Sequence, residues 1–258
     1  MLDPRIERML QETEEESSLS SLAARDLREA VATSPYLVGV MTKAIDNGDV
    51  RRIQFAHTPN EGGHYSADDK AISVNADVLQ RPNRSERIDQ LTGVLGHETG
   101  HALMARSNEI STCTLSYRID EALKEGARYG DATVDITPLA KAYVKASREG
   151  EALAELVSMN SVASRVKHED PHVTNAELLR RLDPTTPCVI NGRLTQGIQI
   201  DAQGIQHTEN RIDSPAISAV AICQFDQSGK GLARWVARIT TPTTCPTLCP
   251  LALRCPGT

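Results

Sequence analysis

The feature that most constrains the fold of this chain is the segment from Leu91 to Met104, Leu-Thr-Gly-Val-Leu-Gly-His-Glu-Thr-Gly-His-Ala-Leu-Met. Its apolar residues recur with the spacing of one helix face, which predicts a helix. Positions four apart on a helix lie one above the other, so His97 and His101 project from the same face with Glu98 beside them. The three glycines of the segment would let other backbone or a substrate come close to this helix.

This arrangement of side chains points to a metal site. Two imidazoles on one face can supply two of the three protein ligands of a catalytic zinc and leave the fourth position for water. Glu98 would then accept a proton from that water as it attacks a polarised carbonyl. The alternative is a buried helix whose histidines happen to be four residues apart. The hairpin-like stretch before the segment and the acidic helix after it favour the metal site.

The third metal ligand is expected from the segment Glu151-Ala-Leu-Ala-Glu155, in which two carboxylates stand one helical turn apart. We favour Glu151 as the ligand and Glu155 as the residue that hydrogen-bonds a ligating imidazole and fixes its tautomer. Glu155 remains the alternative ligand. A solvated acidic face is the other interpretation, but the intervening residues are apolar and no basic residue stands four positions on to pair with either carboxylate.

Four other histidines are weaker candidates: His57 and His64 lack a partner at ligand spacing, and His168 and His172 are four residues apart but not on one helix. His57 and His64 lie on predicted strands, and Pro171 separates His168 from His172, so that these two cannot share a regular helix. We expect all four at the surface. A donor that stabilises the oxyanion is also required; the candidates, none with a spacing argument, are Tyr129, Tyr143 and His64.

Composition narrows the class of protein. The 258 residues are 40% hydrophobic but only 3% aromatic, which predicts an aliphatic interior. The net charge of −6 without a basic cluster argues against a nucleic-acid partner. No run approaches the roughly 18 apolar residues of a membrane span, and the charged N-terminus lacks the apolar core of a secretory signal. Three of the six cysteines fall after residue 244, so the body of the chain allows one optional bridge and no disulfide framework.

Periodicity and cap residues predict an α+β fold in which helices cover a small mixed or antiparallel sheet. The predicted helices, in chain order, are about 3–16, 20–31 with Ser20 as cap, 35–47, 85–104 with Asn83 or Ser85 as cap, 116–129, 137–146, 151–163, 175–182 and 213–225. A Ser/Thr-rich loop is expected before Ser116, Thr137 is expected to cap the next helix, and Gly150 is expected to interrupt it. The predicted strands are 53–57, the hairpin 64–75, and a short hairpin around Asn191-Gly192.

These elements suggest four parts of the chain. We expect an N-terminal helical cover at 1–48, a core that holds the metal site at 49–185, and a smaller hairpin-plus-helix part at 186–230. The remainder, 231–258, is rich in Thr, Pro and Cys and has no helix or strand period. This tail is expected to be poorly ordered.

Three motifs together carry a resemblance to a known family. Leu95-Gly-His-Glu-Thr-Gly-His101 is preceded by Ala71-Ile-Ser-Val-Asn-Ala-Asp77 and followed by Glu151-Ala-x-Ala-Glu155-x-x-x-x-Asn160. In this pattern the chain resembles the zincin-like metallopeptidase toxin domains of bacterial secreted effectors, which occur in polymorphic toxins and in effectors of type IV or type VI secretion systems. The similarity covers about residues 50–225, and its specific part is confined to the two helices with the candidate ligands.

The resemblance implies a zincin-like α+β fold and a zinc-dependent peptidase of the glutamate-ligand type. Its Zn²⁺ ligands would be His97, His101 and Glu151, and Glu98 would be the catalytic base. The expected partners are a protein or peptide substrate and an immunity protein or secretion-system component. The expected location is the bacterial cytoplasm, with export by a leaderless route. Two alternatives stay open: a zinc-dependent hydrolase of peptidoglycan peptides or amides, and a metal-free binding module that has kept only the fold.

The chain departs from this family after Phe225-Asp226. Relatives of this type continue with a glycine-rich stretch and a Ser-Asp-Tyr-x-Asn-Tyr-Tyr run, whereas this chain continues Leu232-Ala-Arg-Trp-Val-Ala-Arg-Ile-Thr-Thr. Such a string is what a shifted reading frame would produce from the expected codons. Our hypothesis is a frameshift near Gly231, which would remove any contribution of the end of the domain to the site.

Overall fold

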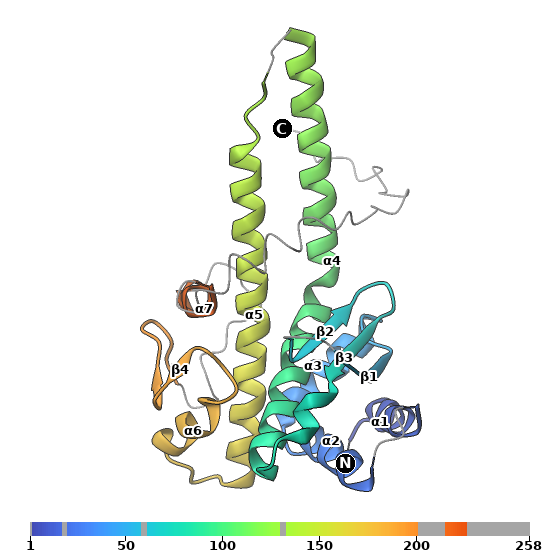
Figure 1. Ribbon diagram of the computed structural model, residues 1–258, viewed down its shortest axis with the longest axis vertical. Coiled ribbons are helices and arrows are strands. Elements are labelled where there is room, and N and C mark those ends of the chain that lie inside the picture. Colours follow the sequence, from blue (N-terminus) through green and yellow to red (C-terminus); the bar gives the residue numbers. More distant parts are fainter. Residues whose placement is uncertain (1, 17–19, 58–60, 130–132, 201–214, 226–258) are drawn as a thin grey trace.

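The computed structural model describes residues 2–16, 20–57, 61–129, 133–200 and 215–225 (Figure 1). The described chain is a mixed α+β structure in which helices predominate. Its elements, in chain order, are α1 (Pro4–Glu16), α2 (Ser21–Ala32), α3 (Pro35–Asp46), β1 (Arg52–Ala56), β2 (Gly63–Ser66), β3 (Ala71–Asn75), the 3₁₀ helix η1 (Ala76–Gln80), α4 (Arg84–Tyr129), α5 (Thr137–Glu169), α6 (Asn175–Leu182), β4 (Val189–Ile190), β5 (Arg193–Leu194) and α7 (Pro215–Phe225).

Side-chain caps explain where several helices begin. The hydroxyl of Ser20 accepts a hydrogen bond from the backbone N–H of Ala23 at 3.2 Å, as its position before α2 predicted. Before α4, Asn83 is the cap, because its side-chain oxygen accepts from the N–H groups of Ser85 and Glu86. The prediction of Thr137 as a cap is wrong: it is the first residue of α5 and its N–H is bound by the Asp135 carboxylate at 2.9 Å.

A three-stranded sheet supports one side of α4. Its strand order is β1-β3-β2, with β1 parallel and β2 antiparallel to β3. The hairpin predicted over residues 64–75 is therefore confirmed, and its turn contains Lys70 in a left-handed conformation. Every residue of β3 is buried, because this strand is central and lies against α4. Strand β2 is an edge strand, and it also contacts α4.

Two long helices, α4 and α5, form the centre of the molecule and run side by side (Figure 1). Two sequence predictions fail on them. The Ser/Thr-rich loop expected before Ser116 does not exist, since α4 continues unbroken to Tyr129. Gly150 does not interrupt α5 either. Serine and threonine disfavour a helix only weakly, and a glycine costs about 1 kcal/mol, less than the loss of a helix that is already formed and packed.

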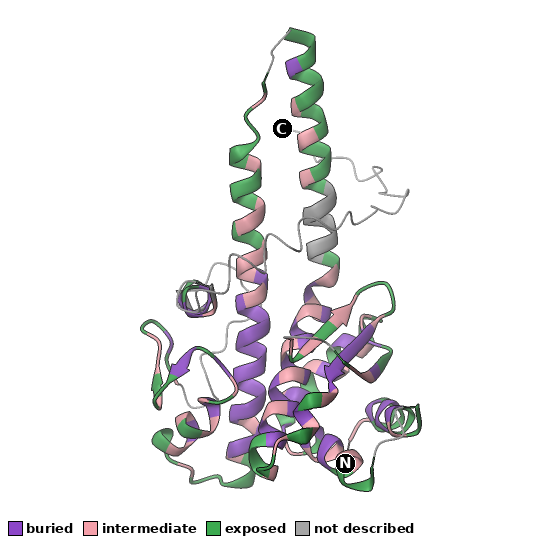
Figure 2. Ribbon diagram, in the orientation of Figure 1, coloured by how far each residue is buried: buried purple, intermediate pink, exposed green. Residues whose placement is uncertain are grey.

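The core consists of two clusters of buried aliphatic side chains, as composition predicted. The first lies between α1–α3, the sheet and α4, and includes Leu10, Leu27, Met41, Ile72 and Leu95. The second lies between α5, α6, the β4-β5 hairpin and α7, and includes Leu156, Met159, Val162, Leu178 and Val220. Residues 87–104 of α4 and 150–166 of α5 are therefore mostly buried, in the lower half of the view in Figure 2.

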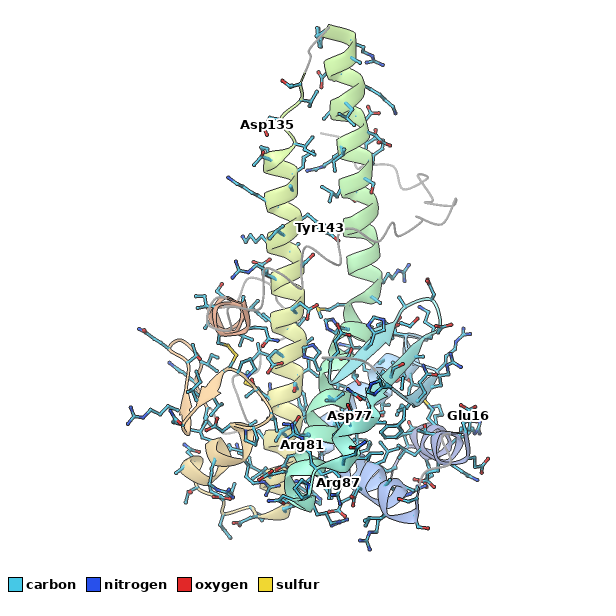
Figure 3. All side chains as sticks on the ribbon, in the orientation of Figure 1. Glu16, Asp77, Arg81, Arg87, Asp135 and Tyr143 are labelled. Atoms are coloured by element: carbon cyan, nitrogen blue, oxygen red, sulfur yellow. A yellow bond between two sulfur atoms is a disulfide. The ribbon has the colours of Figure 1, made fainter. Side chains whose placement is uncertain are left out.

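The second cluster contains a disulfide between Cys188 and Cys223, which joins the residue before β4 to helix α7 (Figure 3). It agrees with the expectation of at most one bridge in the body of the chain. The hairpin around Asn191-Gly192 and the helix ending at Phe225 are also present. The division of the chain at residues 48 and 185 stays a prediction, and the tail 231–258 lies outside the described residues.

Beyond Arg106 in α4, and before Gly150 in α5, the two helices project away from the rest of the described chain as an arm (Figure 1). Over residues 114–129 and 133–149 the arm is largely exposed (Figure 2). Tyr117, Leu123 and Tyr129 on this arm are 51%, 51% and 77% exposed. Among the described residues, no helix combines the length and apolar character needed to cross a lipid bilayer.

Candidate metal centre

Three side chains from α4 and α5 converge close to the base of the arm. His97 and His101 come from α4, and Glu151 comes from α5. The two histidine Nε2 atoms lie 3.1 Å apart. The Oε2 atom of Glu151 lies 3.6 Å from Nε2 of His97 and 3.4 Å from Nε2 of His101. Among the described residues, this is the group of His, Cys, Asp and Glu side chains whose spacing would suit a metal ion.

These spacings fit a tetrahedral zinc site. Zinc–nitrogen and zinc–oxygen bonds of about 2.0–2.1 Å in a tetrahedron place the donor atoms about 3.3–3.4 Å from one another. The three measured distances, 3.1, 3.4 and 3.6 Å, lie on both sides of that value. The three side chains are 18–22% exposed, so the site is partly shielded but open to a small ligand.

Three glycines of α4 allow α5 to come close enough for this convergence. A Cβ atom added at Gly100 would lie 2.7 Å from the backbone Cα of Ala154, and one at Gly96 would lie 2.6 Å from the hydroxyl of Ser161. At Gly93 the nearest atom, the hydroxyl of Ser158, would be 3.2 Å away. The close approach that the sequence predicted for these glycines is thus the approach of α5, which carries the third candidate ligand.

Glu155 lies one helical turn beyond Glu151 on α5 and contacts His97. Its Oε2 atom lies 3.2 Å from Nδ1 of His97, and its side chain is only 6% exposed. A proton on Nδ1, donated to this carboxylate, leaves Nε2 of His97 as the lone-pair nitrogen that faces Glu151. The geometry therefore puts Glu151 in the group of three and Glu155 behind His97, in the arrangement that the sequence favoured.

The carboxylates around the two histidines favour a positive charge at this site, as the pKa values of His97 and Glu151 show. Burial alone would lower the pKa of His97, but hydrogen bonds to Glu151 and Glu155 outweigh it and hold this pKa well above its usual value. Burial opposes ionisation of Glu151 as well, yet His101 and His97 lower its pKa far below the ordinary range. One oxygen of Glu155, Oε1, is buried without a hydrogen-bond partner among the described residues. A buried polar oxygen without a partner is costly, and a cation bound to the neighbouring His97 would offset part of that cost.

Glu98 follows His97 on α4 and is 5% exposed. Strand β2 lies on its side of the helix: a Cβ atom added at Gly63 would lie 3.1 Å from Cγ of Glu98 and 2.7 Å from Cγ1 of Val94. The absence of a side chain at Gly63 therefore leaves room for the Glu98 side chain beneath the edge strand.

The other candidate residues do not join this group. His57 is exposed and 3.8 Å from Asp77, and His64 is exposed on β2. His168 and His172 are exposed, as expected. His168, however, lies in the last turn of α5, which continues beyond the predicted end near residue 163 and stops at Glu169, before Pro171.

The two tyrosines considered as oxyanion donors lie on the arm. Tyr129 stands 28 residues beyond His101 on the same helix, which is about 42 Å at 1.5 Å per residue, so this candidate was wrong. Tyr143 precedes Glu151 by two helical turns on α5, about 12 Å along the axis (Figure 3).

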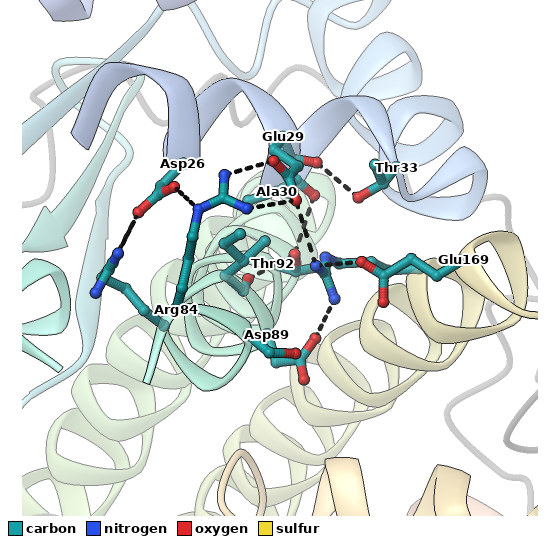
Figure 4. Close-up of polar contacts among 12 residues, drawn as sticks. Asp26, Glu29, Ala30, Thr33, Arg84, Asp89, Thr92 and Glu169 are labelled. Carbon is teal, nitrogen blue, oxygen red and sulfur yellow. Dashed lines mark hydrogen bonds and ion pairs between the residues drawn. The ribbon is translucent and has the colours of Figure 1, made fainter. Parts of the chain in front are cut away.

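A buried network of ion pairs near the start of α4 was missed by sequence reasoning (Figure 4). Asp26 of α2 is paired with Arg84 and Arg87 of α4, at 2.9 and 2.7 Å. Arg84 is also 2.6 Å from Glu29. These contacts attach α2 to α4.

A second part of the same network attaches α5 and α6 to α4. Asp89 of α4 is 1% exposed and binds both Arg165 of α5 and Arg181 of α6. Arg165, also 1% exposed, lies 2.6 Å from Glu169. Only the pair Arg165–Glu169, four residues apart, left a signal in the sequence.

Comparison with family models, with curated proteins and with solved structures found no match to this chain. The assignment of a function therefore depends on the geometry of the site and on the motifs of the sequence.

Proposed function

We propose that this chain binds one Zn²⁺ through His97, His101 and Glu151 and hydrolyses peptide bonds. The observation that carries the proposal is the convergence of three donor atoms, from two helices, at the mutual distances of a tetrahedral zinc site. Two imidazoles and one carboxylate are a donor set that zinc prefers, and three protein ligands leave a fourth position open.

Zinc in such a site polarises a carbonyl and makes a water molecule more acidic. The residues of the chain have separate tasks. Glu98, adjacent to a ligand, accepts the proton of the attacking water and delivers it to the leaving amine. Glu155 holds His97 in the tautomer that offers Nε2. Strand β2, with one edge unpaired in the described sheet, would hold an extended peptide beside Glu98 by strand addition.

The motif resemblance supports a zincin-like fold and a bacterial effector or toxin role for this proposal. The corresponding proposals are a protein or peptide substrate, an immunity protein or secretion-system component as partner, and synthesis in the bacterial cytoplasm.

Zinc content and proteolysis of the purified protein test the proposal together. We expect about one zinc per chain and cleavage of an unfolded protein substrate, with Glu98→Gln retaining zinc while losing nearly all turnover. Near-zero zinc in protein purified without chelators, and no uptake of added zinc, would refute the metal site and favour a binding module. Unchanged proteolysis by Glu98→Gln would refute the mechanism, and activity on purified sacculi alone would redirect it to peptidoglycan.

A further inference from the structure

The contacts between α4 and α5 follow one antiparallel register from end to end. At the end of the interface nearest the arm, His101 faces Glu151 at 3.4 Å and His97 faces Glu155 at 3.2 Å. At the lower end, Asp89 binds Arg165. Glu151 and Arg165 are 14 residues apart, two heptads, so they lie within about 40° of the same side of α5. On α4, Asp89 precedes His97 and His101 by 8 and 12 residues, which is about 80° and 120° around the helix.

Between these polar ends the α4 side of the seam is made of glycines, and the α5 side is mostly small residues with Val157 and Val162 beside them. Gly93, Gly96 and Gly100 of α4 face Ala154, Ser158 and Ser161 of α5. Small side chains let two helices come close, but they provide few knobs that interdigitate. A seam of this kind determines the distance between the helices better than it determines their position along the axis.

The axial position is determined by a group that we call the Asp89 clamp, consisting of Asp89, Arg165, Arg181 and Glu169. Asp89 accepts hydrogen bonds from Arg181 at 2.5 and 2.7 Å in addition to the one from Arg165. Arg165 and Arg181 both also bind Glu169, at 2.6 and 3.2 Å. Arg165 therefore bridges Asp89 of α4 and Glu169 of α5 with its two terminal nitrogens, and Arg181 of α6 holds Asp89 with a two-bond fork. Such guanidinium–carboxylate bonds are directional, so a shift of α5 and α6 along α4 breaks the bond from Arg165 and the fork from Arg181 together.

A zinc site tolerates little shift of this kind. One residue of slippage moves a helix by about 1.5 Å, whereas zinc–ligand bonds keep their lengths within about 0.2 Å. Buried ion pairs add little net stability, because their desolvation is costly, and their best-supported role is to specify one register among several. We propose that the Asp89 clamp sets the axial register of α5 on α4 and so positions Glu151 against His97 and His101, with Arg165 as the positioning residue. The proposal rests on the proposed metal site.

The chain offers a matched control for the test. Arg165 and Arg87 are both buried arginines, and each binds an aspartate that a second arginine also binds. Arg87, however, joins α2 to α4: its polar contacts among the described residues go to Asp26 and to the backbone carbonyl of Arg81. Arg165→Met and Arg87→Met therefore remove comparable buried charges, and only the first loosens the α4–α5 register.

The measurements are zinc affinity by chelator competition, the visible absorption spectrum of the Co²⁺-substituted protein, and the thermal midpoint, all on the full chain. We expect Arg165→Met to bind zinc at least tenfold more weakly and to lose intensity in the tetrahedral Co²⁺ bands. Arg87→Met should retain the affinity and spectrum of the wild type even if its thermal midpoint falls. Arg165→Lys keeps the charge but lacks the two nitrogens that bind Asp89 and Glu169 at once, so it should show a smaller loss of affinity than Arg165→Met.

Wild-type affinity and spectrum in Arg165→Met would overturn the positioning role. An equal loss of affinity in Arg87→Met would also overturn it, since general destabilisation would then explain the effect. If Arg165→Met does not fold, Arg165→Lys decides the question, and wild-type zinc affinity with an unchanged Co²⁺ spectrum would count against the proposal. Failure of the wild-type protein to bind zinc would instead refute the proposed function. The zinc affinity of the wild type therefore separates this outcome from a failure of the positioning role alone.

Discussion

Nδ1 of His97 lies 3.2 Å from Oε2 of Glu155, on the side of the ring opposite the nitrogen that faces Glu151. One glutamate therefore shares the candidate metal position with the histidines, and the other, one helical turn away, orients a histidine. The two carboxylates have the same chemistry and similar sequence surroundings. Their different roles follow from the way α5 crosses the face of α4.

This division of roles predicts different losses for the two glutamates. Glu155→Gln should weaken zinc binding by roughly 10- to 100-fold, because a neutral amide orients His97 but no longer increases its basicity. Glu151→Gln should reduce it further, since a ligand is lost. Chelator competition measures both, with Glu149→Gln as a control on the same helix, where the carboxylate pairs with Lys145 outside the site. A larger loss for Glu155→Gln than for Glu151→Gln would reverse the assignment.

The approach of α5 to α4 predicts that Gly100 tolerates no side chain. In Gly100→Ala the new Cβ would lie 2.7 Å from the backbone of Ala154, so the helices must separate. We expect a destabilisation of about 1–3 kcal/mol and weaker zinc binding.

Gly39→Ala in α3 is the matched control for Gly100→Ala, since no atom lies within 4 Å of its added Cβ. Because alanine favours a helix more than glycine does, Gly39→Ala should stabilise the fold by about 0.5–1 kcal/mol. Chemical denaturation measures both changes. A Gly100→Ala protein as stable as Gly39→Ala would show that the seam is not tightly packed.

Local patterns were sufficient to predict much of this structure. The helix Asn175–Leu182 has the predicted bounds, because Thr174 caps it and its apolar residues are periodic. The hairpin before α4 was predicted from the alternation of apolar and polar residues along each strand. The candidate ligands were predicted from pairs of His or Glu residues four positions apart on a helix. Each depends on residues that are neighbours in the sequence.

The features that sequence reasoning missed depend on distant residues. Asp89 and Arg165 are 76 positions apart, and nothing near either one indicates a buried pair. The continuation of α4 past Met104 was missed for another reason: weak local helix-breaking signals were weighed without the helix that precedes them. Once such a helix is formed and packed, extending it costs less than ending it.

The shifted pKa values predict how zinc binding depends on pH. Zinc binds neutral imidazole, so it must displace the proton that His97 retains in the metal-free protein. Zinc affinity should therefore increase with pH above 6.5, by up to about tenfold per pH unit for each proton displaced, until His97 is deprotonated. Glu155→Gln removes one cause of the raised pKa and should move this dependence to lower pH.

The metal-free protein should show the complementary dependence of stability. The raised pKa of His97 stabilises the fold fully below the ordinary histidine value and loses this contribution as the pH rises through the folded-state pKa. The lowered pKa of Glu151 stabilises above the ordinary carboxyl value and loses it as the pH falls through the folded-state pKa. The gap in thermal midpoint between zinc-loaded and metal-free protein should therefore widen from pH 6 to 8. A constant gap would contradict the coupling.

The disulfide between Cys188 and Cys223 predicts a dependence of stability on redox conditions. It closes a loop with a sequence separation of 35 residues, which in the chain-entropy model stabilises the fold by about 4 kcal/mol. Helix α7 packs on α5, in the cluster that also contains Ala152 and Leu156 of the turns carrying the two glutamates. Reduction should therefore lower the thermal midpoint and also increase the rate of zinc loss to a chelator. Cys188→Ala should show both effects without reductant and should no longer respond to reductant. A wild-type protein whose zinc loss is unaffected by reduction, while its midpoint falls, would show that α7 stabilises the fold without supporting the site.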